Sequence, residues 1–218
     1  MSIKKTHKKP KAPKININAL LPRPKPIKWG RPVELLEEAL KYPLYGCWID
    51  EGWVEGGLAQ VVVARQQSPG QVFFGVYLVD YYCLGIKNCY WLADTSERAF
   101  QRHLEQLPGH FIPCDPALAH ELIYGAVEYA AFYGFQPQMD FREAKLVLEL
   151  PETYPPTGKV KFGYEGKPLY IAGPDDDPER ILAKLEKAAG QGNYSYLMGL
   201  SSMEDVELFE AGDSEIEE

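Results

Sequence analysis

The sequence lacks the long apolar segments that membrane insertion requires. No apolar run approaches the roughly 20 residues that span a bilayer, and the N-terminal residues lack the apolar stretch of a secretory signal. The sequence therefore predicts a soluble, cytoplasmic protein with no membrane partner.

Several short motifs of enzymes and nucleotide-binding proteins are absent as well. The chain contains no phosphate-cradling GxxxxGK(S/T), no GxGxxG after a strand, no GxSxG elbow and no HExxH. These absences exclude the enzyme classes that the motifs mark.

Cysteine is scarce, and its spacing excludes a zinc knuckle. The four cysteines, Cys47, Cys83, Cys89 and Cys114, are widely spread and form no closely spaced pair. A chain of 218 residues with 45% hydrophobic residues can build a core without disulfides. Reduced, mostly buried thiols are expected, and no cofactor is predicted.

Charge of one sign is missing from each end of the chain. Residues 1–31 hold ten Lys or Arg and no acid, whereas residues 201–218 hold eight acids and no base. The body between them holds 13 basic and 23 acidic residues, a net charge of −10. The basic arm either binds phosphates of nucleic acid, folds back on the acidic body, or keeps the chain in solution. The lysines that would contact nucleic acid are Lys4, Lys5, Lys8, Lys9, Lys11 and Lys14.

Composition divides the chain into three parts. Residues 1–31, rich in Pro and Lys, bury too little apolar surface to fold and are predicted to be a disordered arm. Residues 32–200 fit one globular domain, with a candidate subdomain break at the prolines near 151–158. Residues 201–218 are predicted to be a disordered acidic tail.

The β-forming stretch 72–90 organises the expected fold. Its first residues are apolar on both faces, which predicts an interior strand. Two strands precede it, over 45–53 and 58–65, with a tight hairpin turn expected at Gly56-Gly57. Together the three strands predict an antiparallel meander.

Capping residues and apolar spacing predict helices along the rest of the domain. They are expected after Pro32, after Thr95 or Ser96 as far as Leu107, from Pro116 to near Gly134, and from Pro178 to Gly190. A strand is expected over 146–150, and a hairpin around Glu165-Gly166. The predicted fold class is α+β: an antiparallel β-meander backed by helices, with a C-terminal β-hairpin and helix unit.

Asp80 is the most notable single residue, because it follows a run of apolar strand residues. A buried carboxylate must be hydrogen-bonded, paired, bound to a cation or protonated. Either it accepts hydrogen bonds from the turn at 84–86 or pairs with Lys87, or it takes part in catalysis.

A catalytic constellation can be assembled from Asp80, His120 and a second carboxylate, Glu121 or Asp140. Such residue types suit metal-assisted hydrolysis or general acid and base chemistry, with a divalent metal as the cofactor. The alternative is that His120 packs against the sheet as part of the core. His120 and Glu121 lie about 100° apart around a helix, so both cannot face one site squarely.

Two further features have structural explanations beside chemical ones. The acids at 175–177 would bind a divalent cation or cap the following helix, and the calcium-loop pattern is missing. Cys114 precedes a helix, a position that lowers a thiol pKa, although the neighbouring Asp115 raises it again.

Three stretches resemble a group of uncharacterised bacterial proteins. They are LVDYYCLGIK (78–87), AHELIYGAVEYAAFYGFQPQMDF (119–141) and YIAGPDDDPERI (170–181). The resemblance covers roughly residues 45–198 and implies one compact domain, with no activity attached. Where the pattern GFxPHxDF of that group has a His, this chain has Gln138, which weakens an enzymatic interpretation.

The sequence favours a non-catalytic accessory or interaction protein whose basic arm contacts nucleic acid or a nucleoprotein partner. A metal-dependent hydrolase or nuclease that uses Asp80, His120 and Glu121 is the second hypothesis. A module that binds only other proteins is the third.

Brief protease treatment tests the predicted division of the chain. Residues 1–31 and 203–218 are expected to be removed while 32–200 survives, because proteases cut chain segments without packed structure first. Mass spectrometry of the products gives the boundaries. Persistent protection of the arm in the isolated protein would show that it folds onto the body.

Overall fold

The computed structural model describes residues 38–198 and 208–210. The predicted arm, its six lysines and most of the predicted helix after Pro32 lie outside these residues. The described part begins at Glu38, and η2 (Ala39–Lys41) is a single 3-10 turn.

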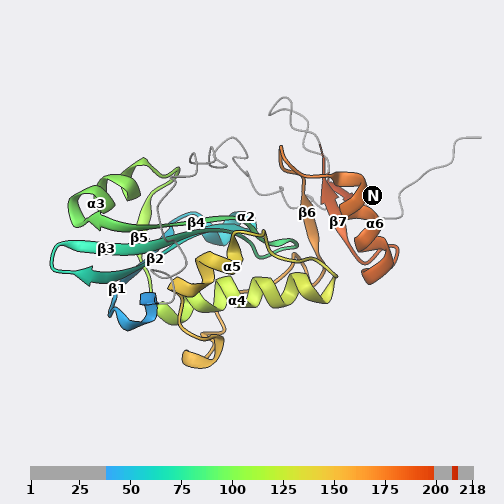
Figure 1. The fold of residues 1–218 in the computed structure, drawn as a ribbon. Helices are drawn as coiled ribbons and strands as arrows, with labels where there is room; N and C mark the ends of the chain where they lie inside the picture. Colours follow the sequence, from blue (N-terminus) through green and yellow to red (C-terminus); the bar gives the residue numbers. More distant parts are fainter. Residues whose placement is uncertain (1–37, 199–207, 211–218) are drawn as a thin grey trace, which may run out of the picture.

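A five-stranded antiparallel sheet forms the body of the protein (Figure 1). Its order is β4-β3-β2-β1-β5, so the predicted meander is confirmed and extends to a fourth strand. β3 is paired on both sides, as expected of an interior strand, and β2 holds the middle position. The strands are β1 (Leu44–Asp50), β2 (Leu58–Ser68), β3 (Gln71–Asp80), β4 (Gly85–Ser96) and β5 (Phe111–Pro113).

Helices cover both faces of this sheet (Figure 1). On one face the strands pack against α4 (Pro116–Phe132) and the short α5 (Phe141–Ala144), and on the other against α3 (Glu97–Gln106). Side chains alternate between the faces. Residues Val61, Val63, Tyr77 and Val79 belong to the α4 side, and residues Val62, Ala64, Phe74 and Val76 to the α3 side.

Local capping sets where the helices begin. Ser96 accepts a hydrogen bond from the Ala99 amide at the start of α3, and Asp115 accepts one from the Ala117 amide at the start of α4. These side chains satisfy amide groups that the helix leaves free. The predicted helix starts are confirmed at both positions.

Close packing of α4 against the sheet depends on small residues. Ala126 and Ala130 are buried, and a Cβ added at Gly85 of β4 would lie 3.0–3.1 Å from them. At Gly125 the close neighbour is Phe162 instead, because a Cβ added there would lie 2.3 Å from its ring.

The expected tight turn at Gly56-Gly57 is wrong in its length. A one-turn helix, α2 (Trp53–Gly56), lies between β1 and β2, and Gly57 ends it with a φ of 71°. The ring of Tyr82 occupies the space that a side chain at Gly57 would need. A residue with a side chain would therefore clash at this position.

The strand expected over 146–150 is also wrong. This segment forms a 3-10 turn, η3 (Lys145–Val147), and then an extended link to η4 (Pro151–Thr153). Its carbonyl groups accept hydrogen bonds from side chains rather than from a neighbouring strand. The Val147 carbonyl accepts from Arg65 Nε at 2.6 Å, and the Glu149 carbonyl accepts from the Tyr124 hydroxyl at 2.8 Å.

A second, smaller sheet and one helix form the C-terminal unit, which confirms the predicted fold class. β6 (Leu169–Ile171) runs parallel to β7 (Ser195–Leu197), and α6 (Pro178–Ala189) connects them. β8 (Leu208–Glu210), within the predicted acidic tail, pairs antiparallel with β7. Asp177 caps α6 and Gly190 ends it, as the sequence predicts.

The predicted hairpin around Glu165-Gly166 is reduced to a turn. Only Tyr164 and Lys167 pair across it, because the flanking residues bind the loop that joins β3 to β4. The Gly163 amide donates to the Tyr81 carbonyl at 3.0 Å, and the Leu169 amide donates to the Tyr82 carbonyl at 3.2 Å.

An ion pair joins the C-terminal unit to the main sheet. Lys87 Nζ of β4 lies 2.7 Å from Asp176 Oδ2, just before α6, and the two side chains are 10% and 14% exposed. Asp176 also accepts from the Gly173 amide at 2.7 Å. Across the ranges 38–198 and 208–210, no helix has both the length and the apolar character that a membrane crossing requires.

Breaking this ion pair should destabilise the protein by about 3 kcal/mol, because the remaining partner would be a largely buried, uncompensated charge. Urea unfolding of Lys87→Met and Asp176→Asn measures the loss, and the double variant should recover part of it. Lys41→Met is the control, since Lys41 and Glu38 form an exposed pair worth at most about 0.5 kcal/mol. Equal small losses at both pairs would contradict a structural role for Lys87 and Asp176.

Candidate functional site

Asp80 lies at the end of β3 and holds the loop that follows it. The side chain is 1% exposed, and Oδ1 accepts from the Tyr82 amide at 3.1 Å and the Cys83 amide at 2.9 Å. Burial raises the pKa of Asp80 to about 6, although Lys87 and the backbone amides lower it. In the described part of the chain no partner reaches the buried Oδ2 atom.

Of the roles expected for Asp80, hydrogen bonding to the turn that follows β3 is close to the observed arrangement. The Tyr82 and Cys83 amides that bind it come directly before the expected turn at 84–86, and the Leu84 amide within that turn also lowers the pKa of Asp80. Lys87 pairs with Asp176 rather than with Asp80, and its charge reaches Asp80 only as a longer-range attraction.

His120 lies on α4 and is 3% exposed. Its Nε2 atom lies 3.1 Å from Glu149 Oε2, and its ring packs against the rings of Tyr124 and Tyr154. The Nδ1 atom is buried with no partner among residues 38–198. The imidazole therefore belongs to the core, as its structural interpretation expected.

Arg65 and Glu149, which sequence reasoning missed, form the centre of this buried cluster. Arg65 is 3% exposed on β2, and its Nη2 lies 2.7 Å from Glu149 Oε1. Burial by itself raises the pKa of Glu149, but the contacts with His120 and Arg65 outweigh it and lower the pKa to about 2. An arginine at the end of the apolar run 58–64 was the one signal in the sequence that pointed here.

Glu121 points to a different part of the molecule and fastens a loop. Its carboxylate accepts from the Thr157 amide at 2.8 Å, the Gly158 amide at 3.1 Å and the Thr157 hydroxyl. These bonds hold the segment at 151–158, where the sequence suggested a subdomain break, against α4.

The remaining candidates, Asp140 and Cys114, do not form a catalytic site with the residues above. Asp140 is exposed at the start of α5 and makes no capping hydrogen bond. Burial, together with Asp115, raises the pKa of the Cys114 thiol to about 12, the opposite of what a nucleophile requires. All four cysteines are free.

Helix geometry separates Asp80 from His120. Gly85, which pairs with Asp80 across the strands, meets α4 at Ala126 and Ala130. His120 precedes those positions by six and ten residues, or about 9 and 15 Å along a helix that rises 1.5 Å per residue. The structure therefore does not bring Asp80, His120 and Glu121 to one point. In the part of the chain that the structure describes, no three His, Cys, Asp or Glu residues form a metal-binding group.

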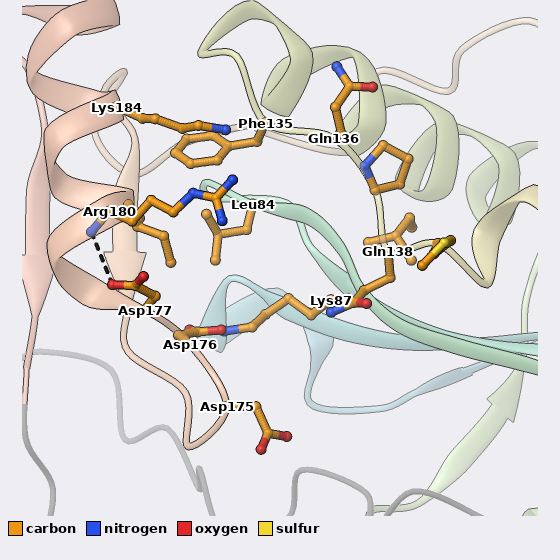
Figure 2. Close-up of a pocket in the computed structure, with 14 residues that line it drawn as sticks. Leu84, Lys87, Phe135, Gln136, Gln138, Asp175, Asp176, Asp177, Arg180 and Lys184 are labelled. Atoms are coloured by element: carbon orange, nitrogen blue, oxygen red, sulfur yellow. Dashed lines mark hydrogen bonds and ion pairs between the residues drawn. The ribbon is translucent and has the colours of Figure 1, made fainter.

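A pocket of about 460 Å³ lies between the main sheet and the C-terminal unit (Figure 2). The start of β4 lines it, as do the loop at 135–139 after α4 and the first turns of α6. Sequence reasoning missed it because its walls come from three distant segments. Gln138, singled out by the resemblance, is one of the lining residues.

Comparisons of the chain with protein-family profiles, with curated proteins and with solved structures find no match. Any function must therefore be argued from the residues themselves.

The pKa of Asp80 predicts an unusual pH dependence. Between about pH 4 and pH 6 the folded state holds a proton that the unfolded state has released, so stability falls as the pH rises. The loss is about 3 kcal/mol in total. Asp80→Asn keeps an acceptor for the Tyr82 and Cys83 amides and cannot ionise. The free energy of unfolding of Asp80→Asn should equal that of the parent protein at pH 4 and exceed it at pH 8.

Denaturant unfolding at both pH values measures this difference, with Asp140→Asn as the exposed control. Asp80→Ala, which leaves both amides without an acceptor, should lose about 1–3 kcal/mol at pH 4. That loss should exceed the effect of Glu215→Ala in the acidic tail. An unchanged midpoint for Asp80→Ala would mean that the carboxylate is not an essential part of the loop.

Proposed function

We propose that this is a non-catalytic interaction protein whose basic N-terminal arm, residues 1–31, contacts nucleic acid or a nucleoprotein partner. One observation carries the non-catalytic part of the proposal. The three side chains nominated for catalysis each make a separate structural contact: Asp80 with the loop at 82–83, His120 with Glu149, and Glu121 with Thr157 and Gly158.

Protonation argues in the same direction. A general base must be free to take a proton from a substrate. The Glu149 carboxylate beside His120 is stabilised in its charged form by Arg65, and the other Arg65 contacts go to backbone carbonyls. This arrangement stabilises the fold and keeps the Glu149 carboxylate charged.

Charge separation supports nucleic acid as the partner. The body carries a net charge of −10, which repels phosphates, so contact with nucleic acid falls to the ten basic residues of the arm. Lysines that neutralise phosphates release bound counterions, and this makes such binding strongly dependent on salt.

Fluorescence anisotropy with labelled single- and double-stranded DNA and RNA tests the proposal. Affinity should fall about a thousandfold between 50 and 200 mM salt if about six phosphates are contacted. Deletion of residues 2–31 should abolish binding. Replacement of the six lysines at 4, 5, 8, 9, 11 and 14 by Gln should remove most of the salt dependence.

The matched control is Lys159→Gln/Lys161→Gln, which changes two exposed lysines of the folded domain and should leave binding intact. The same tubes, supplied with a divalent metal, test the hydrolase or nuclease hypothesis. Metal-dependent cleavage that disappears in Asp80→Asn would overturn the proposal, and the absence of both binding and cleavage would direct attention to a protein partner.

A further inference from the structure

The pocket beside α6 contains Arg180, whose guanidinium forms no ion pair with any residue that the structure describes. Arg180 lines the pocket, and Figure 2 shows its side chain extending from α6 toward Leu84 and Phe135. Only its backbone amide is engaged, with the Asp177 carboxylate at 3.2 Å. Within the described residues no acceptor contacts the guanidinium, and an arginine in this state can bind a carboxylate through two parallel hydrogen bonds.

The other cations of the pocket are already engaged. Lys87 is paired with Asp176 at 2.7 Å. Lys184 Nζ donates to the Gly134 carbonyl at 3.2 Å and lies 5.4 Å from the centre of the Phe135 ring. Its contact with a neutral carbonyl leaves its charge uncompensated, so Lys184 adds positive potential beside Arg180.

Apolar side chains form the wall next to these cations. Leu84, Phe135 and Ile181 line the pocket, and all three belong to the hydrophobic cluster that includes Leu185 and Tyr170. Met139, with 86% of its surface exposed, lies at the loop side. A ligand therefore meets a positive group and an apolar surface side by side, the combination typical of small-molecule sites.

Carboxylates in the same pocket restrict the charge of the ligand. Asp175 and Asp177 both line the pocket, and both side chains are exposed. A group with two or more negative charges would be repelled by them more strongly than a group with one.

We infer that this pocket binds a small monocarboxylate with an apolar body. Arg180 binds the carboxylate with help from Lys184, and the apolar body packs on Leu84, Phe135 and Ile181. This binding site is separate from the proposed nucleic-acid contact of the arm and does not depend on it.

Ligands with one shared body and different head groups test the inference. The full chain is titrated with phenylacetate, phenylacetamide, phenethylamine and phenyl phosphate at 150 mM salt, with the methyl signals of Met139 and Ile181 followed by NMR. Phenylacetate should shift both signals and bind at least about tenfold more tightly than the other three, because only it matches the charge and the forked geometry of Arg180.

Matched variants assign the effect to the pocket. Arg180→Gln should weaken phenylacetate binding about tenfold or more, and Arg102→Gln, an exposed arginine on α3, should not change it. Asp175→Asn should raise the affinity for phenyl phosphate more than that for phenylacetate. The folded NMR spectrum of each variant confirms that the comparison is between native proteins.

Three results would overturn the inference. They are the absence of shifts at millimolar phenylacetate, equal binding of phenylacetamide, and unchanged binding in Arg180→Gln. Tighter binding of phenyl phosphate by the parent protein would overturn the assignment of a monocarboxylate and identify a phosphate site.

Discussion

The contacts of the buried Arg65 guanidinium are the interactions on which the fold most depends. Arg65 lies on the middle strand of the sheet and binds the Val147 carbonyl, the Tyr42 carbonyl and the Glu149 carboxylate. An arginine in a core is tolerated only when its donors are satisfied, since removal of a charge from water costs several kcal/mol. The segments before β1 and after α5 are therefore fixed to the sheet by one side chain, and Glu149 extends the link to His120 on α4.

This arrangement explains why the polar residues of the core give little support to catalysis. Arg65 and His120 both contact the Glu149 carboxylate, while Asp80 and Glu121 each fasten a loop. The Arg65, Asp80 and Glu121 side chains form hydrogen bonds with backbone groups of segments outside the strands and α-helices, and so hold those segments in place.

The pocket is a consequence of how the C-terminal unit docks. The Lys87–Asp176 pair and the backbone bonds from Gly163 and Leu169 to the loop after β3 attach the unit along one edge. On the adjoining side, a pocket of about 460 Å³ lies between α6 and the loop at 135–139. Arg180 faces that space because Asp177 and Pro178 set the start of α6, and with it the direction of its first turn.

Local patterns in the sequence determined the strands of the meander, the three caps at Ser96, Asp115 and Asp177, and the α+β class, since each depends on residues a few positions apart. They also determined the strong separation of charge along the chain. Only the tertiary structure decided that 146–150 is not a strand and that Arg65 and Glu149 meet His120. These contacts join residues as many as 82 positions apart, and periodicity and capping carry no information at that range.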